Sequence, residues 1–179
     1  MERSMELSLA LSLIRGIPDF PQPGILFKDI TPLLANGEAL KSITHALGES
    51  ENPYTCVAGI EARGFIVGSA IAVDRNVGFI PLRKAGKLPH QTISKSYGLE
   101  YGVDIIEAHI DAVNSTDKVL IVDDVLATGG TLVAAIEIIT DLGAEISEVV
   151  ALFEIEGLGG REKIAARFPN IKVRSLVKA

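Results

Sequence analysis

The sequence predicts an α/β fold in which a mostly parallel, twisted sheet is flanked by helices. The apolar runs are short and are interrupted by Asp, Arg and Gly, as in strands that are covered on both faces. Segments typical of strands and of helices alternate along most of the chain, which is the order of a parallel sheet. The length of 179 residues, with 47% hydrophobic and 22% charged residues, indicates one globular domain spanning residues 1–179.

The N-terminal part carries two less regular segments. Residues 4–15 fit both an alternating strand and one helical face, and their Leu, Ala, Met and Glu content favours a helix. Residues 17–32 contain four prolines, which fix φ and remove donors, so we expect a rigid, irregular segment that is neither helix nor central strand. Asn36 then caps a helix that runs to about Leu47, with Leu40 and Ile43 on its apolar face.

The remaining elements alternate. Apolar content predicts strands at residues 55–60, 77–82, 104–111, 118–125, 147–155 and 171–177, and helices at residues 64–73, 131–144 and 159–168. In 104–111 the apolar residues alternate with Glu107, His109 and Asp111, which is the pattern that predicts a strand there. Residues 83–102 are polar, with three glycines and no periodicity, which predicts a long loop. Such loops are usually functional.

Charge and composition exclude several kinds of protein. A net charge of −6 argues against a nucleic-acid binder that works by phosphate neutralisation. No apolar run approaches the roughly 18–20 residues of a membrane span, and the N-terminus lacks the basic start of a signal peptide. The single cysteine, Cys56, is expected to be a buried small hydrophobe, and no Cys/His spacing marks a metal site, so we assign no metal ligand. We expect a cytoplasmic protein.

The segment 119–131 carries the strongest chemical signal. Its apolar strand ends in Asp123 and Asp124, and the residues Ala127, Thr128, Gly129, Gly130 and Thr131 then open a helix. The glycines permit close approach of a ligand to main-chain N–H groups, the threonines add hydroxyl donors, and the helix dipole favours an anion. The pattern therefore predicts a phosphate cradle. It is not a Walker A loop, and the glycines of 157–160 do not complete a dinucleotide fingerprint.

The paired aspartates indicate what else the ligand carries. Two carboxylates would repel a phosphate chain placed directly against them, whereas ribose hydroxyls can donate to both. The competing interpretation is a tight turn with two solvated acids.

This segment resembles the phosphoribosyl-diphosphate (PRPP) motif of type I phosphoribosyltransferases. Residues 19–30, 61–65, 83–89 and 97–102 are further similar to the adenine phosphoribosyltransferases, so the resemblance runs in order along nearly the whole chain. Ala108 and Val125 are mild departures from the family pattern. The resemblance implies the type I phosphoribosyltransferase fold, with a small N-terminal hood at about residues 1–34 and a flexible catalytic loop at about 84–102.

The resemblance also assigns roles to residues. It places Ala127–Thr131 on the 5′-phosphate and the two aspartates on the ribose hydroxyls. It places Arg63, Lys87 and the turn of Glu61 and Ala62, joined by a cis peptide, on the pyrophosphate. Arg83 and Lys84 become anion contacts, in the same subunit or in the neighbouring one. On residue type alone, the alternative is that Arg63 and Lys87 are ordinary surface cations.

The same resemblance implies a base site and a catalytic acid. Phe27 is expected to stack on adenine with Val125 on the other face, while main-chain groups near Leu26 and Lys28 read the base edge. Glu100 is expected to be the catalytic glutamate. By residue type alone, the alternative is that Phe27 is a core residue and that Glu100 is a solvated surface residue.

The implied reaction converts adenine and PRPP to AMP and pyrophosphate, which is purine salvage. It implies Mg²⁺ held mainly by PRPP, pyrophosphate and water, and a homodimer, with no nucleic acid or membrane as partner. Two alternatives stand beside it: a phosphoribosyltransferase for another base such as xanthine or orotate, and a non-catalytic regulator that senses PRPP. The hood sequence argues against the first. The lack of room for a DNA-binding domain, and the presence of Lys87 and Glu100, argue against the second.

Overall fold

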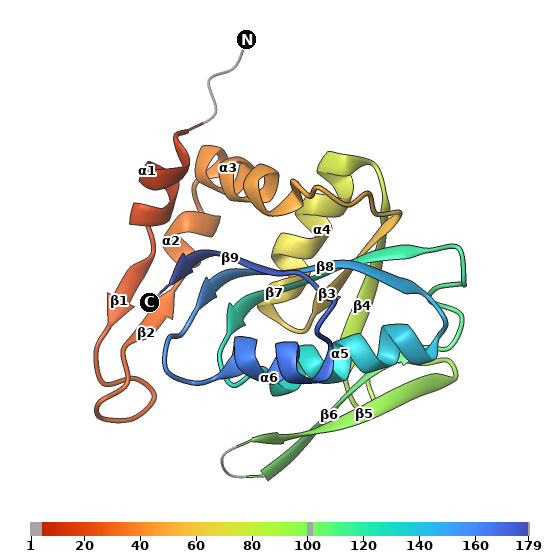
Figure 1. Ribbon diagram of the computed structural model, residues 1–179. Helices are drawn as coiled ribbons and strands as arrows, with labels where there is room; N and C mark the ends of the chain where they lie inside the picture. The colour runs from red at the N-terminus through yellow and green to blue at the C-terminus, as the bar shows by residue number, and fades with distance from the viewer. Residues whose placement is uncertain (1–4, 100–101, 179) are drawn as a thin grey trace. The chain divides into compact units, whose positions relative to one another are not determined.

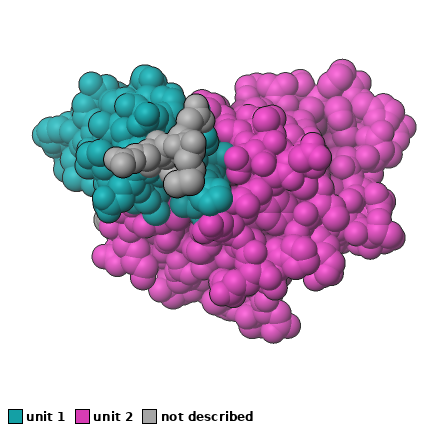
Figure 2. All heavy atoms as spheres, turned by 90° about the horizontal axis from the view of Figure 1, so that it is seen from above, with its two compact units in different colours: residues 1–46 teal, residues 47–179 magenta. Residues whose placement is uncertain are grey.

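The protein is described from a computed structural model that covers residues 5–99 and 102–178. The chain divides into two compact units, residues 1–46 and residues 47–179, which Figure 2 colours separately. Glu100 lies outside the described residues.

The first unit contains three helices and a two-stranded antiparallel sheet: α1 (Leu7–Ser12), β1 (Arg15–Ile17), β2 (Phe27–Asp29), α2 (Thr31–Leu34) and α3 (Gly37–Gly48), whose last residues belong to the second unit. The helix expected in residues 4–15 is confirmed by α1. Asn36 caps α3 as expected, because its Oδ1 accepts the Ala39 N–H at 3.0 Å.

The expectation of wholly irregular structure in residues 17–32 is wrong in part. Phe27 pairs with Ile17 and Lys28 with Gly16 in the small sheet, and α2 begins at Thr31. Pro32 is compatible with this helix because it sits in the first turn, where its missing N–H has no intrahelical partner. The strand is not a central one, so that part of the expectation holds.

The second unit is built on a seven-stranded sheet, shown in Figure 1, with the order β5-β6-β4-β3-β7-β8-β9. The four pairings among β4, β3, β7, β8 and β9 are parallel, while β6 pairs antiparallel with β4 and β5. The strands are β3 (Cys56–Ile60), β4 (Gly78–Lys84), β5 (Thr92–Leu99), β6 (Gly102–His109), β7 (Lys118–Leu126), β8 (Glu145–Glu154) and β9 (Val173–Lys178). A mostly parallel sheet is therefore confirmed.

Three helices cover this sheet: α4 (Arg63–Arg75) on one face, and α5 (Gly130–Asp141) and α6 (Gly160–Arg167) on the other (Figure 1). Every residue of β3 is buried, and Val119–Val122 of β7 are 0% exposed. This two-sided burial explains why both strands are continuous apolar runs. Cys56 is buried as expected, and burial raises the pKa of its thiol.

The loop expected at residues 83–102 is largely wrong. β4 continues to Lys84, and residues 92–99 form β5, which pairs with β6 from Thr92↔His109 to Leu99↔Gly102. Ile93 and Tyr97 alternate with polar residues, but the intervening Lys95 and the serines mask the pattern. This segment is a strand because it pairs with β6, which follows it in the sequence.

Candidate active site

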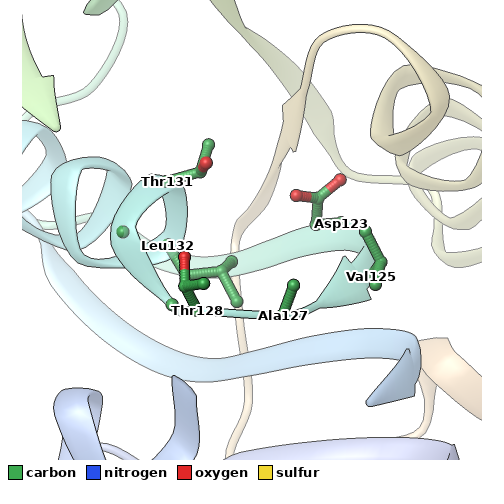
Figure 3. Close-up of a pocket in the computed structure, with 8 residues that line it drawn as sticks. Asp123, Val125, Ala127, Thr128, Thr131 and Leu132 are labelled. Atoms are coloured by element: carbon green, nitrogen blue, oxygen red, sulfur yellow. The ribbon is translucent and has the colours of Figure 1, made fainter. Parts of the chain in front are cut away.

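The carboxyl end of β7 leads into a pocket at the N-terminus of α5 (Figure 3). Gly129 has φ 75°, a left-handed conformation that turns the chain sharply from strand to helix. The pocket has a volume of about 90 Å³, is partly open to solvent, and is lined by residues 127–132 with Asp123 and Val125. Within the described part of the chain, no side chain caps the first turn of this 12-residue helix. Its first N–H groups and positive dipole end therefore suit a phosphate.

Asp123 and Asp124 are consecutive residues of β7, and Asp123 lines this pocket. Asp123 is 9% exposed and Asp124 3%. Asp123 Oδ1 accepts the Asp124 N–H at 2.8 Å, and Figure 3 shows the Asp123 carboxylate standing at the pocket with the side chains of Thr128 and Thr131. Burial is the main cause that raises the pKa of both carboxyls, and the neighbouring charge of Asp124 raises that of Asp123 further.

Arg63, the first residue of α4, compensates part of this charge. Its Nε lies 2.9 Å from Asp124 Oδ2. This contact is an ion pair rather than an aligned hydrogen bond, because Oδ2 is a buried atom that accepts no hydrogen bond from the described residues. The Arg63 guanidinium opposes the rise of the Asp124 pKa. A buried acceptor without a donor is unusual, and a donor supplied by a ligand hydroxyl would satisfy it.

A second charged cluster surrounds Glu61, next to the Glu61–Ala62 peptide, which is cis as expected. Glu61 Oε1 lies 2.7 Å from Lys87 Nζ, and Oε2 lies 3.3 Å from Arg83 Nε and accepts the Lys84 N–H at 3.0 Å. The hydrogen bond from Lys87 is the largest cause that lowers the pKa of Glu61 to about 2. The structure thus brings Lys87 and Arg83 together around one carboxylate.

The ammonium group of Lys84 is held elsewhere. It donates to the Tyr97 hydroxyl at 2.7 Å and pairs with Asp104, and the Tyr97 hydroxyl donates to Asp104 at 3.0 Å. The Lys84 side chain therefore contacts the β5–β6 hairpin at the pair Tyr97 and Asp104, near the end of β5, whereas its main-chain N–H donates to Glu61.

Glu107 is a site residue that sequence reasoning missed. It is 6% exposed, and its Oε1 accepts the N–H groups of Gly86 at 3.0 Å and of Lys87 and Leu88 at 3.3 Å each. These donors stabilise the buried carboxylate, so it fixes the turn that carries Lys87. Its only sequence signal was its place in the alternating run 104–111, which predicts a strand and does not indicate this role.

The residues expected at the base fall in two units. Leu26, Phe27 and Lys28 belong to the first, where the Phe27 ring lies 5.2 Å from that of Phe20 in an edge-on contact and Leu26 is 55% exposed. Val125 belongs to the second unit and lines the phosphate pocket.

A mostly parallel sheet, with two buried carboxylates near the carboxyl end of a central strand and an uncapped helix N-terminus after it, is typical of α/β proteins that bind phosphorylated ligands. Comparison with known proteins agrees with this class. Residues 29–175 match the model of the phosphoribosyl transferase domain. The chain is 49% identical to the adenine phosphoribosyltransferase of Chelativorans sp. over 99% of its own length and 97% of that protein's, and 52% identical to that of Streptomyces clavuligerus over 87% and 89%.

Solved structures give the same result. The adenine phosphoribosyltransferase of Thermoanaerobacter pseudethanolicus superimposes with a TM-score of 0.90 at 41% identity, covering 97% of this chain and all of that one. The Saccharomyces cerevisiae enzyme, complexed with adenine and an imino-altritol bisphosphate, has a TM-score of 0.84 at 35% identity over 94% and 98%. The chain belongs to the phosphoribosyltransferase family, among the adenine phosphoribosyltransferases. In the described residues, no helix is long and apolar enough to cross a membrane.

Proposed function

We propose that this protein transfers the phosphoribosyl group of PRPP to N9 of adenine, giving AMP and pyrophosphate in purine salvage. The observation that carries the proposal is the buried Asp123–Asp124 pair, with Arg63 on one side and the open N-terminus of α5 on the other. One carboxylate oxygen still lacks a donor. A ribose 5-phosphate fits this arrangement because its hydroxyls donate to the acids while its phosphate accepts from the helix.

The reaction exchanges one bond at C1′ for another. The bond from C1′ to the pyrophosphate oxygen breaks, the bond from C1′ to N9 forms, and the proton on the adenine imidazole ring is lost. The ribose becomes cationic as the leaving group departs. Asp123 and Asp124 then stabilise the transition state more than the neutral ground state, because their charges are fixed in a buried site.

Arg63 and Lys87 bind the leaving pyrophosphate, with Arg83 beside them. In the free protein Glu61 holds Lys87 and Arg83, which keeps both cations near the turn where the anion arrives. Glu107 fixes the turn under Lys87 and acts through it. Glu100 is the catalytic glutamate, an assignment that rests on resemblance alone.

Mg²⁺ would be held mainly by PRPP, pyrophosphate and water. Among the described residues no group donates a hydrogen bond to Asp124 Oδ2, and a carboxylate oxygen of this kind could accept from a water or hydroxyl that such an ion binds. When bound, the ion neutralises the developing charge on pyrophosphate.

By the family resemblance, Phe27 stacks on adenine, main-chain groups near Leu26 and Lys28 read its edge, and Val125 is a further base contact. Adenine offers an amino donor and an N1 acceptor, whereas hypoxanthine presents the opposite pattern at both atoms. A site built to hydrogen-bond its substrate discriminates by roughly 10⁴–10⁵ against such a mismatch.

The enzyme works in the cytoplasm as a homodimer. Ile66 and Val73, seven residues apart on α4, are 44% and 83% exposed, so this helix offers an apolar face for a second copy.

The test is a panel of adenine, hypoxanthine, guanine and xanthine with PRPP and Mg²⁺, measured by pyrophosphate release. Asp123→Asn removes a carboxylate with almost no change in side-chain volume. Purified in parallel, it is also the control for contaminating host enzyme, since a contaminant would give the same activity in both preparations. Of the four bases, we expect only adenine to be turned over. The turnover rate of the variant should be at least about 10²-fold lower, which is the effect of losing one electrostatic contact to the transition state.

Two results would contradict the proposal. Comparable turnover with hypoxanthine or xanthine would remove the base assignment and keep the phosphoribosyl chemistry. Tight PRPP binding without turnover on any base would indicate a sensor of PRPP instead of an enzyme.

A further inference from the structure

Gly160, the first residue of α6, packs directly against the turn that leads into α5. It is buried, and a Cβ built on it would lie 2.1 Å from the Ala127 carbonyl oxygen and 2.9 Å from the Gly129 nitrogen. The contact is reciprocal, because a Cβ on Gly129 would lie 2.6 Å from the Gly160 carbonyl oxygen. Two glycines thirty-one positions apart therefore touch through main-chain atoms alone.

These distances leave no room for any side chain at position 160. A carbon atom 2.1 Å from a carbonyl oxygen is far inside van der Waals contact, and the atoms in the way are main-chain atoms that no rotamer change can remove. A Cβ would also lie 2.8 Å from Leu126 Cδ1. One of the two segments must move.

Gly160 differs from its neighbours in this respect. Gly157 and Gly159 have positive φ and open space where a Cβ would stand, so they shape the loop between β8 and α6. Gly160 carries no positive φ, and only the close approach requires a glycine there. The glycine-rich segment 157–160 thus serves a purpose other than the dinucleotide fingerprint that its sequence fails to complete.

We infer that Gly160 is a positioning residue for the 5′-phosphate: α6 supports the phosphate turn from behind and sets where its N–H groups point. The inference rests on the proposed function, because it takes residues 127–131 as the phosphate site. The atoms that a side chain would displace, Ala127 O and Gly129 N, belong to that turn. Asp123 and Asp124 lie upstream on β7, so a substitution at Gly160 should weaken recognition of the phosphate and leave that of the ribose.

The experiment compares AMP with adenosine, which differ only in the phosphate. Dissociation constants of both are measured by calorimetry for the wild type and for Gly160→Ala, and their ratio reports the phosphate contribution. We expect AMP affinity to fall by about 10–100-fold, the equivalent of one or two weakened charge-assisted hydrogen bonds, while adenosine affinity stays within about twofold.

Two further variants separate positioning from loss of stability. Gly37→Ala is the matched control, since Gly37 is also the first residue of its helix and a Cβ there meets nothing within 4 Å. Ile164→Ala removes a fully buried side chain of α6 and adds no atom to the phosphate turn. It should lower the melting temperature and leave the AMP-to-adenosine ratio unchanged.

The outcomes are distinguishable. A wild type that binds AMP no better than adenosine overturns the proposed phosphate site and this inference with it. A wild type that prefers AMP, with Gly160→Ala keeping the full preference or losing both ligands equally, overturns the inference alone.

If Gly160→Ala does not fold, Gly129→Ala introduces the same clash from the other side. Gly143→Ala is then the control for the cost of placing alanine in a left-handed conformation, because Gly143 has φ 88° and a Cβ there would meet nothing within 4 Å. A retained AMP preference in Gly129→Ala also overturns the inference.

Discussion

Replacing Arg63 with alanine should destabilise the protein through the carboxylates that Arg63 faces. Its Nε lies 2.9 Å from Asp124 Oδ2, and the Asp124 side chain is 5% exposed, next to the buried Asp123. Breaking a fully buried ion pair costs about 3–5 kcal/mol. The Arg63 side chain is 35% exposed, so water screens it, and we reduce this to roughly 1.5–2.5 kcal/mol. For a chain of this size that is a fall of about 3–10 °C in melting temperature.

The pH dependence identifies the cause. Arg63 opposes the rise that burial produces in the pKa of Asp124, so its removal raises that pKa further. The deficit is largest at high pH, where the Asp124 carboxylate loses its proton and has no counter-charge. As the pH falls through the raised pKa, Asp124 takes up a proton and the difference between variant and wild type shrinks.

Thermal unfolding followed by circular dichroism between pH 5 and pH 8 measures this, in a double-mutant cycle with Asp124→Asn. The double variant should recover most of the stability, because an amide needs no counter-charge. Arg167→Ala, which breaks a pair whose arginine is 60% exposed, is the control and should change little. A deficit that is independent of pH, or that Asp124→Asn does not relieve, would refute the electrostatic account.

Three further predictions concern Asp123, Glu61 and Glu107. Asp123→Asn should abolish turnover yet raise the melting temperature near pH 8, by about 2–4 °C per kcal/mol relieved, because burial and Asp124 make its charged form unfavourable; an unchanged melting temperature would contradict this. Glu61→Gln should destabilise the protein at pH 7, and the difference should vanish as the pH falls from about 4.5 to about 2, since the Glu61 pKa is lowered to about 2 and its stabilising charge is lost over that interval; acid titration of stability measures it. Glu107→Ala should lower the free energy of unfolding by about 1.5–3 kcal/mol and should also weaken the inhibition by pyrophosphate. Glu107→Gln should recover part of both, because its amide oxygen still accepts from the N–H groups of the Lys87 turn. Equal effects of the two variants would count against positioning by hydrogen bonds.

The sequence by itself determined the elements whose physics is local. The run 119–131 predicts strand, turn and helix because apolar residues, paired acids and glycines follow one another directly, and the structure places all of them where the spacing indicates. Asn36 predicts its cap for the same reason. Resemblance added the Glu61–Ala62 cis peptide, which no local pattern indicates.

Only the tertiary structure decided three other features. Residues 92–99 become a strand because β6 pairs with them, although their own composition favours a loop. Glu107 is buried because N–H groups about twenty positions away solvate its carboxylate. Gly160 must be a glycine because the turn at Ala127 and Gly129 lies against it. In each case the deciding energy comes from contact between segments distant in sequence, whereas periodicity and turn chemistry describe only neighbours along the chain.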